Sequence, residues 1–255
     1  MTLKGKHAVV TGGATGIGLA ITMALCAAGA SVTIMGRNKK RLDKIAASEE
    51  NVSAIAMDVT NQTSVKNAFS AASKISPISI LINNAGSAET NPFHKISYET
   101  WQKMLDVNLT GVFLTTQAAL ADIKAAKNGR IINIASTSGL KGHAYASAYS
   151  AAKHGVIGLT RSLSIELSKT EITVNAICPG FTNTDIVAQA LENITAKTGR
   201  SREEALNDLL ATDGQKRLVE PDEVADEVLK LCDPKNRSIN GKAIVMNGDE
   251  IIIKD

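Results

Sequence analysis

Short apolar runs rich in β-branched residues alternate along the chain with longer segments in which apolar residues recur about every 3.6 positions. The short runs predict strands at residues 7–11, 31–35, 52–57, 79–83, 130–135, 173–178 and 243–246. The longer segments predict helices, among them 17–28, 63–74, 100–126 and 151–168. Strands that are apolar almost throughout are typical of a sheet covered on both faces. We therefore predict an α/β fold: a doubly wound, Rossmann-like, parallel seven-stranded sheet with helices on both faces.

One segment, residues 182–217, breaks this alternation. It holds no predicted strand and two helical patterns, and Ser201 and Glu204 have the spacing of a capping box at the start of the second pattern. A long insertion in an otherwise economical fold is often functional. Since no linker or low-complexity run divides the chain, we predict a single dinucleotide-binding catalytic domain over residues 1–255, with a substrate lid at about 182–217.

The composition is that of an ordinary globular protein, with 44% hydrophobic and 21% charged residues. A net charge of +3 is too small to indicate nucleic acid or a membrane surface as a partner. No segment approaches the roughly 18 consecutive apolar residues of a membrane-spanning helix, and no secretion signal is recognisable. Cys26, Cys178 and Cys232 are scattered without CxxC spacing, which indicates reduced core thiols. We therefore expect a cytoplasmic protein.

A glycine-rich loop, TGGATGIG at residues 11–18, follows the first predicted strand and opens a helix. Glycine allows a tight turn with positive φ and a close approach of the backbone to a ligand. The N-terminus of the next helix offers free N–H groups and the positive end of its dipole, which suit a pyrophosphate. In this position the motif indicates a dinucleotide site, although the glycines alone also fit a tight turn.

The end of the second predicted strand bears on the choice of nucleotide. In dinucleotide-binding folds an acidic residue in this region binds the ribose hydroxyls, whereas an arginine accommodates a 2′-phosphate. Here there is no Asp or Glu, and Arg37 is present. The basic residues 39–41 that follow are typical of a solvated helix face. The sequence thus favours NADP(H), with NAD(H) as the alternative.

Tyr149 and Lys153 lie four residues apart in a predicted helix, and therefore on one face of it. A tyrosine has an ordinary pKa of about 10, which is too high for efficient proton exchange near neutral pH. A neighbouring ammonium group favours the phenolate and should lower that pKa. The pair is a candidate general acid and base, although the spacing alone also fits an ordinary contact on a helix surface.

Other polar and glycine residues follow the predicted strands. The NNAG motif at 83–86 follows the fourth strand, Ser136 follows the fifth, and the PG dipeptide at 179–180 follows the sixth. Like the glycine loop after the first strand, they lie at carboxyl ends, where a doubly wound sheet binds its ligands.

With these motifs in this order, the chain resembles the short-chain dehydrogenase/reductase family in its classical form. The resemblance covers nearly the whole length: TGGATGIG at 11–18, Asp58-Val59, NNAG at 83–86, NLTG at 108–111, Ser136, the Tyr149 and Lys153 pair, and PG at 179–180. It implies an oxidoreductase that transfers a hydride, without a metal, between a nicotinamide and a carbonyl or carbinol carbon. The four histidines have no HxxxH or HExxH spacing, in agreement with this.

The resemblance also implies a role for each matching catalytic residue. Ser136 would bind the substrate oxygen, and Tyr149 would exchange a proton with it. Lys153 would lower the pKa of Tyr149 and bind the nicotinamide ribose. Asn108 would hold a water molecule in a proton relay.

For the cofactor, the resemblance places Asp58 and Val59 at the adenine, Asn84 at the adenine-side ribose and Thr184 at the carboxamide. The expected cofactor-binding residues are Gly12, Thr15, Gly16, Ile17, Gly18, Arg37, Asp58, Val59, Asn84, Ala85, Gly86, Tyr149, Lys153, Pro179, Gly180, Thr182 and Thr184.

Several of these assignments have alternatives. Asn108 could simply bridge helix and strand backbones. Ser138 could face the substrate in place of Ser136, although the separation of Ser136 from Tyr149 matches the family better. His143 is either a substrate contact or a loop histidine without a role, and Tyr145, with no lysine four residues on, is at best a substrate contact.

The C-terminus departs from the family. Where the family often has an Asp-Gly-Gly-like turn, this chain has Asn247-Gly248-Asp249-Glu250 and then an apolar run at 251–253, so its packing is not predicted. The resemblance further implies a homotetramer formed through the helices at 100–126 and 147–168.

The substrate is the least determined part of the prediction. Residues 152–158 and 198–201 are similar to those of 3-hydroxybutyrate dehydrogenases and of 3-oxoacyl reductases acting on acyl carrier protein or CoA thioesters. We expect a small molecule of the 3-oxoacyl/3-hydroxyacyl or 3-hydroxybutyrate type. Lys197, Arg200 and Arg202 would meet its carboxylate or pantetheine phosphate, or else be solvated. The alternatives are a general alcohol, sugar or steroid-like dehydrogenase and a non-catalytic NADP-binding redox sensor.

Overall fold

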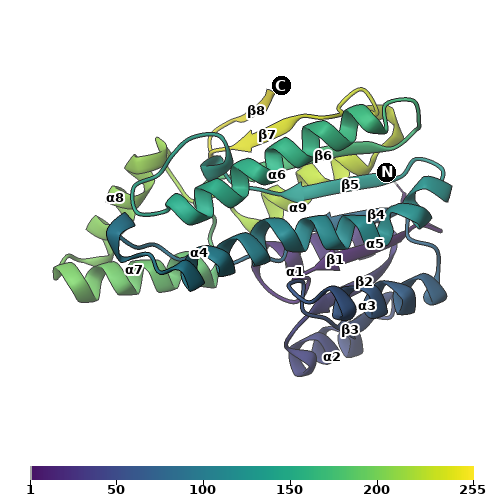
Figure 1. Cartoon of the computed structure of the whole chain (residues 1–255), viewed down its shortest axis with the longest axis horizontal. Helices are drawn as coiled ribbons and strands as arrows, with labels where there is room; N and C mark the ends of the chain where they lie inside the picture. The colour runs from purple at the N-terminus through teal and green to yellow at the C-terminus, as the bar shows by residue number, and fades with distance from the viewer. Residues whose placement is uncertain (1) are drawn as a thin grey trace.

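A computed structural model describes residues 2–255, and across them eight strands form one sheet in the order β3-β2-β1-β4-β5-β6-β7-β8 (Figure 1). Strands β1 to β7 run parallel, and β8 is antiparallel to β7. The strands are β1 (His7–Thr11), β2 (Ser31–Gly36), β3 (Val52–Ala56), β4 (Ile80–Asn83), β5 (Arg130–Ile134), β6 (Thr173–Pro179), β7 (Ala243–Met246) and β8 (Ile251–Lys254). The predicted doubly wound α/β fold is confirmed.

Helices cover both faces of the sheet (Figure 1). One face carries α1 (Gly16–Ala27), α2 (Lys39–Ser48) and α9 (Pro221–Cys232), and the other carries α3 (Gln62–Ile75), α5 (Gly111–Ala125) and α6 (Ser147–Glu166). The period of two along a strand decides which side chain meets which layer. In β1, Ala8 and Val10 pack with the α1 and α9 layer, whereas Val9 packs with the α3 and α5 layer.

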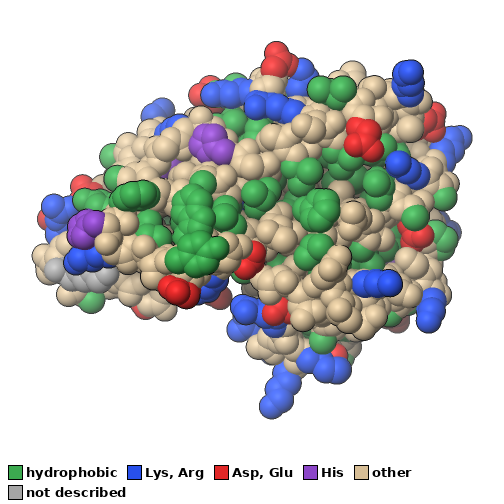
Figure 2. Space-filling model, in the orientation of Figure 1, with side chains coloured by type: hydrophobic (Ala, Val, Ile, Leu, Met, Phe, Trp, Pro, Cys, Tyr) green, Lys and Arg blue, Asp and Glu red, His purple; other side chains and the backbone are tan. Residues whose placement is uncertain are grey.

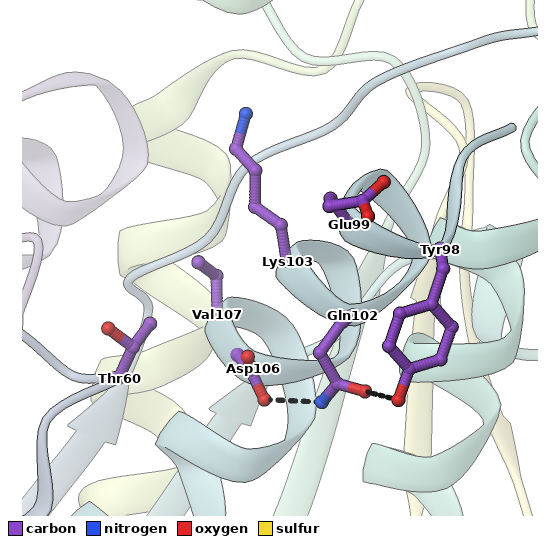
Figure 3. Close-up of a pocket in the computed structure, with 7 residues that line it drawn as sticks. All are labelled: Thr60, Tyr98, Glu99, Gln102, Lys103, Asp106 and Val107. Carbon is purple, nitrogen blue, oxygen red and sulfur yellow. Dashed lines mark hydrogen bonds between the residues drawn. The ribbon is translucent and has the colours of Figure 1, made fainter.

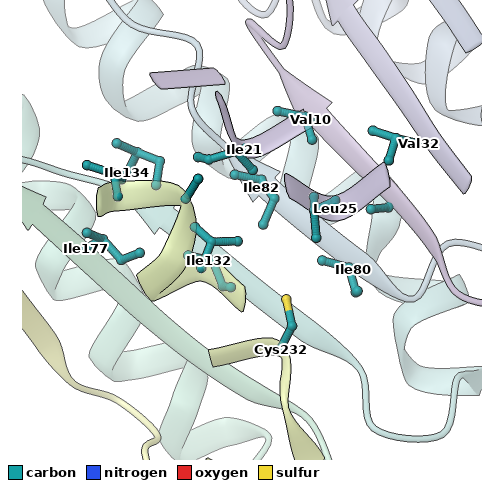
Figure 4. Packing of buried hydrophobic residues seen from close by; sticks show 14 of the residues in the cluster. Val10, Ile21, Leu25, Val32, Ile80, Ile82, Ile132, Ile134, Ile177 and Cys232 are labelled. Carbon is teal, nitrogen blue, oxygen red and sulfur yellow. The ribbon is translucent and has the colours of Figure 1, made fainter. Parts of the chain in front are cut away.

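The core between the sheet and the first of these layers consists almost entirely of aliphatic side chains (Figure 4). Ile21 and Leu25 of α1 reach down onto Ile80 and Ile132, and all four are at most 2% exposed. Such packing removes apolar surface from water and fixes the strand ends relative to one another. The carboxyl edge of the sheet is therefore a rigid platform.

The seven-strand prediction missed β8. Residues 247–250 form a tight turn in which the Asn247 Oδ1 accepts hydrogen bonds from the backbone N–H groups of Asp249 and Glu250, and Gly248 has φ +90°. The isoleucine run at 251–253 then returns along β7 as an edge strand whose three side chains are each more than a third exposed. A short apolar run after one polar turn was too weak a pattern to predict a strand.

The helix predicted at 100–126 is interrupted. It consists of α4 (Tyr98–Leu105), a π-helical turn at Asp106–Thr110 and then α5. A π-helical turn inserts one extra residue per turn and is frequently found at functional sites. Apolar periodicity does not detect it, because the elements on either side stay helical.

The segment at 182–217 contains two helices, as predicted: α7 (Asp185–Thr198) and α8 (Arg202–Asp213). The capping box of Ser201 and Glu204 is present at the start of α8. The two helices pack around a small apolar cluster of their own and project from one end of the sheet (Figure 1). A hollow separates this lobe from the part of the molecule that carries α2 (Figure 2). None of the described helices is long and apolar enough to cross a membrane.

Candidate active site

The predicted site residues converge at one edge of the sheet. The glycine loop after β1, the NNAG motif after β4, Ser136 after β5 and Pro179 at the end of β6 all belong to strands that run parallel and pair in the order β1-β4-β5-β6. Parallel strands bring their carboxyl ends to the same edge. The fold therefore places these motifs side by side.

The glycine loop has the geometry of a phosphate cradle. Gly12 and Gly16 have φ of +66° and +48°, a region that other residues adopt only with strain. A Cβ on Gly18 would overlap the carbonyl group of Gly12. Thr15, the N-cap of α1, makes no side-chain cap hydrogen bond, so it leaves the N–H groups of the first turn available to an anion.

Asn84 helps to shape this loop. Its amide donates hydrogen bonds to the carbonyl oxygens of Thr11 (3.0 Å) and Gly12 (3.3 Å), and its backbone N–H donates to the Thr11 hydroxyl (3.0 Å). The backbone N–H of Ala85 donates to the same hydroxyl at 3.0 Å. Asn84, which was expected at the adenine-side ribose, thus holds the end of β4 against the end of β1.

A cavity of about 230 Å³ lies beside the loop. Its polar lining includes Arg37, Asn38 and Arg41, and none of its lining residues is acidic. The Asn38 side chain caps α2 by accepting a hydrogen bond from the Arg41 N–H at 3.1 Å. Arg41, which the sequence placed on a solvated helix face, therefore joins Arg37 in the cavity wall.

Asp58 and Val59 follow β3. The Asp58 carboxylate accepts hydrogen bonds from the Thr60 N–H (2.9 Å) and hydroxyl (2.8 Å), and these bonds hold the pKa of Asp58 below its ordinary value. The charge of Arg37 acts in the same direction, so the two side chains share one neighbourhood. Val59 packs against Gly111, where a Cβ would lie 3.0 Å from the valine side chain.

Tyr149 and Lys153 lie together on α6, with the lysine Nζ 5.7 Å from the centre of the tyrosine ring. Lys153 is 5% exposed and donates a hydrogen bond to the Ile134 carbonyl oxygen at 2.8 Å. Burial lowers the pKa of Lys153 to about 8. Burial also raises the pKa of Tyr149, with an opposing contribution from Ser136, so the expected lowering of the Tyr149 pKa by Lys153 is not found.

Of the two candidate serines, Ser136 is the one beside Tyr149. Its hydroxyl affects the tyrosine pKa directly and accepts a hydrogen bond from the Ser138 N–H at 3.1 Å. Ser138 is 8% exposed, and its hydroxyl is paired with the His143 Nδ1 at 3.0 Å. The geometry thus favours Ser136 over Ser138 as the substrate-binding serine.

Asn108 lies in the π-helical turn and is completely buried. Its amide donates to the carbonyl oxygens of Ser87 (2.9 Å) and Met104 (3.0 Å), and its Oδ1 accepts from the Ser87 N–H at 3.2 Å. A Cβ on Gly86 would lie 2.9 Å from the same Oδ1. The side chain thus bridges two backbone segments, the alternative that the sequence had left open, and holds the end of the NNAG loop near Lys153.

Beyond β6, the predicted residues connect the sheet to the projecting helices. Thr182 is 5% exposed and pairs with Val219 across an isolated bridge, and Thr184 is the N-cap of α7. The Thr184 side chain lies against the glycine loop, since a Cβ on Gly16 would be 3.3 Å from its Cγ2. A Cβ on Gly180 would overlap the end of the buried Gln215 side chain, which would have to shift.

Below the site, a buried polar network joins β4 and β5 to the helices. The Asn83 amide donates to Asn133 (2.8 Å) and Thr116 (2.9 Å) and accepts from Thr115 (2.7 Å). Asn133 in turn donates to Thr160 at 2.8 Å. Fully paired networks of this kind fix a unique arrangement of the elements that they join.

Sequence reasoning missed two side chains near the site, Asp213 and Gln215, and it missed the partners of His143. Gln215 holds the backbone of Phe181 at both its N–H (2.7 Å) and its carbonyl oxygen (3.2 Å). Asp213 and His143 contact each other from positions 70 residues apart. No local pattern marks such partners, since only the fold brings them together. Arg200, in the segment expected to form a lid, pairs with Asp208 at the surface, and the Lys197 side chain lies outside the described residues.

A larger cavity, of about 490 Å³, lies elsewhere, between Thr60 and the exposed side of α4 (Figure 3). There Tyr98, Gln102 and Asp106 form a hydrogen-bonded row along the helix surface. The cavity contains none of the predicted catalytic residues, so its size does not make it the active site. Within the described residues, no group of three or more His, Cys, Asp or Glu side chains could hold a metal ion.

Comparison with known proteins agrees with this geometry. The family model described as short chain dehydrogenase matches residues 6–195. The chain is 37% identical to a 3-oxoacyl-(acyl-carrier-protein) reductase of Aquifex aeolicus, over 96% of this chain and 97% of the relative. It is 35% identical to a D-beta-hydroxybutyrate dehydrogenase of Cupriavidus necator, over 96% and 98% of the two chains.

Among solved structures, a tryptophan variant of actinorhodin polyketide ketoreductase, determined with NADPH, has a TM-score of 0.89 and 34% identity, with 95% of this chain and 96% of that chain covered. The whole sheet and the helices around it are thus shared with this protein. The chain is an oxidoreductase and belongs to the short-chain dehydrogenase family.

Proposed function

We propose that this oxidoreductase uses NADP(H) to interconvert a 3-oxoacyl and a 3-hydroxyacyl compound. The observation that carries the proposal is the placement of Ser136, Tyr149 and Lys153 at the same sheet edge as a glycine loop built for a pyrophosphate. The names of the similar proteins, a 3-oxoacyl reductase and a D-beta-hydroxybutyrate dehydrogenase, support the substrate class.

The residues present fit a dinucleotide. The pyrophosphate would bind at Gly12 and Gly18, where side chains are sterically excluded, and at the uncapped start of α1. Arg37 and Arg41 would hold a 2′-phosphate in the adjoining cavity, where no carboxylate repels it. NADPH in the similar polyketide ketoreductase supports this choice over NAD(H).

When bound, the nicotinamide would supply or accept the hydride. In the reducing direction, Ser136 donates a hydrogen bond to the substrate carbonyl oxygen and Tyr149 transfers its proton to that oxygen as negative charge develops. The hydroxyl of Tyr149 is protonated at neutral pH, as that of any tyrosine is, so it has a proton to donate; burial raises its pKa and makes it a weaker acid than a free tyrosine. In the oxidising direction, the tyrosine must first lose its proton, which becomes easier as pH increases.

Lys153 has two tasks in this scheme. One of its N–H groups donates to the Ile134 carbonyl oxygen and so fixes the ammonium beside Tyr149. Its remaining N–H groups are available to ribose hydroxyls. With a pKa of about 8, most of the lysine carries a charge at neutral pH, but burial dominates at the neighbouring phenol and raises its pKa.

The experiment that tests the proposal measures NADPH and NADH oxidation with acetoacetyl-CoA and acetoacetate, and NADP⁺ and NAD⁺ reduction with an aldose and with simple secondary alcohols. We expect the highest kcat/KM for NADPH with the 3-oxoacyl compounds. Turnover confined to the aldose or the simple alcohols would support the general dehydrogenase instead. No turnover with any of them would support the non-catalytic redox sensor.

The preference for NADPH has its own test in Arg37→Ala. Loss of a charge-assisted contact to the 2′-phosphate should raise the KM for NADPH by about 10- to 100-fold and leave the KM for NADH unchanged. Lys40→Ala is the matched control, because Lys40 is exposed on α2 and does not line the cavity. Equal effects of Arg37→Ala on both nucleotides would remove the basis for the preference.

We also propose a cytoplasmic homotetramer that forms through α4, α5 and α6. Phe113 on α5 and Ile165 on α6 are 46% and 74% exposed, which supports these helices as the apolar contact surface. The three unpaired cysteines support a reducing compartment.

A further inference from the structure

The last residue of α8, Asp213, carries a carboxylate that is 1% exposed. It accepts hydrogen bonds from the Thr137 hydroxyl at 2.7 Å and from the His143 Nε2 at 3.3 Å, and it forms an ion pair with the Lys141 Nζ at 2.5 Å. All three partners belong to residues 137–143, the segment that directly follows Ser136. A carboxylate from the projecting helices is thus bound in the loop of the catalytic serine.

Further hydrogen bonds connect this contact to Ser136. His143 uses its other ring nitrogen to bind the Ser138 hydroxyl at 3.0 Å, and the Ser138 N–H donates to the Ser136 hydroxyl at 3.1 Å. Phe181 packs edge-on against the His143 ring, with 6.5 Å between the ring centres. An unbroken series of hydrogen bonds therefore joins Asp213 to the serine that would bind the substrate oxygen.

The helical lobe has few other ties to this segment. Its apolar cluster, which includes Val187, Leu191 and Ala205, is separate from the clusters that pack on the sheet. Within residues 2–255, leaving aside the Lys197 side chain, every hydrogen bond and ion pair between residues 182–217 and residues 137–143 ends on Asp213. The position of the lobe over the serine loop thus depends on one buried charge.

We propose that Asp213 is a positioning residue that holds α7 and α8 as a lid over the serine loop, and that it sets the affinity for the carbonyl substrate but not for the nucleotide. A substitution that removes the charge of this carboxylate removes the ion pair with Lys141 and weakens the hydrogen bonds from Thr137 and His143, and so releases the contact. The nucleotide cavity includes neither Asp213 nor any of its three partners, and Thr184, which lies against the glycine loop, precedes α7 as its N-cap, so the two affinities can be separated. The identity of the carbonyl substrate rests on the proposed function, whereas the contact between Asp213 and residues 137–143 does not.

The test compares Asp213→Asn with Asp208→Asn, an exposed aspartate on the same helix. Hydrogen–deuterium exchange of residues 185–213 is measured with NADPH bound, together with the Kd for NADPH and the KM and kcat for acetoacetyl-CoA. Asp213→Asn should speed exchange in α7 and α8 and raise the KM by at least about tenfold, with kcat less affected and the Kd for NADPH within twofold. Asp208→Asn should match the unmodified protein in each measurement.

A second variant guards against a folding failure of Asp213→Asn. Lys141→Ala removes a half-exposed donor and leaves Thr137 and His143 in place, so it should give a smaller change in the same direction. Unchanged lid exchange in both variants overturns the proposal, as does a loss of NADPH affinity in parallel with the rise in KM. A lower Tm with unchanged KM and kcat also overturns it, because a merely structural contact would behave in that way. If the unmodified protein does not reduce acetoacetyl-CoA, the proposed substrate is wrong, and lid exchange alone decides on Asp213.

Discussion

At Tyr149 and Lys153, burial disfavours the charged form of each side chain, so it raises one pKa and lowers the other. The YxxxK spacing predicted the pairing but not this result, because the local environment of a side chain is a property of the fold. In the folded protein, Tyr149 is therefore a neutral phenol, and it lies beside a lysine whose pKa is about 8. A neutral phenol has a proton to give to a carbonyl oxygen, but its raised pKa makes it a weaker acid than a free tyrosine.

The lysine shift has a measurable consequence for stability. Lys153 releases its proton at about pH 8 in the folded protein and near its ordinary value of 10.5 in the unfolded chain. Between these values the unfolded chain binds more protons than the folded protein does. The free energy of unfolding therefore rises with pH, by on the order of 2 kcal/mol between pH 8 and 10. Below pH 8 both states hold the proton, and the contribution is flat.

The check is the difference in unfolding free energy between Lys153→Met and the unmodified protein, measured by urea denaturation from pH 6 to 10. We expect the variant to be the more stable at pH 7, with an advantage that shrinks above pH 8. A difference that stays constant across this range would mean that Lys153 keeps an ordinary pKa in the folded protein.

Asn84 and Asn108 show what a motif does and does not predict at the residue scale. The family motifs predicted that both residues belong to the site, and the structure places Asn84 at the end of β4 and Asn108 in the π-helical turn. Their amides, however, are bonded to backbone groups of Thr11, Gly12, Ser87 and Met104. These hydrogen bonds join residues up to 73 positions apart, which a motif in one segment cannot encode.

At the scale of single elements, the glycine loop and α1 give the sharpest prediction. Gly18→Ala places a methyl group into the Gly12 carbonyl and 2.5 Å from the Asn84 amide nitrogen, so the loop must shift. We expect the Kd for NADPH to rise by at least about tenfold and the unfolding free energy to fall by about 1–3 kcal/mol. Isothermal titration calorimetry and chemical denaturation measure the two effects.

Gly158→Ala is the matched control. Gly158 is an exposed position inside α6, and a Cβ there would meet no atom within 4 Å. Because α6 belongs to the proposed tetramer surface, only nucleotide binding is compared, and alanine should leave NADPH binding unchanged. Equal tolerance of alanine at both glycines would show that the loop is not closely packed.

The elements themselves were predictable to different degrees. Val9 and Ile82 lie in runs that are apolar on both sides, so their strands were evident from sequence. The Ile251–Lys254 edge strand was not, because its three isoleucines face solvent in the single chain and follow an atypical turn. The break at Asn108 was also missed, since a π-helical turn preserves the helical pattern around it.

For the whole molecule, the proposed tetramer makes a prediction about surface apolar groups. Phe113→Glu and Ile165→Glu each place a charge on the surface proposed to be covered, and should reduce the molecular mass measured by light scattering after size-exclusion chromatography. Ile75→Glu is the control, because Ile75 is 50% exposed on α3, outside the proposed contact. A monomeric unmodified protein, or a mass insensitive to both changes, would contradict the proposed assembly.

The whole-molecule account depends on the sheet bringing one acid to one substrate oxygen beside the nucleotide. Its most direct test is Tyr149→Phe, which removes one hydroxyl, with Tyr145→Phe as a control at an exposed tyrosine of the preceding loop. NADPH consumption with acetoacetyl-CoA is measured alongside the Kd for NADPH. We predict that Tyr149→Phe lowers kcat by about 100- to 10,000-fold, with an unchanged Kd, and that Tyr145→Phe stays near the unmodified rate. A Tyr149→Phe variant that retains full turnover would contradict the account.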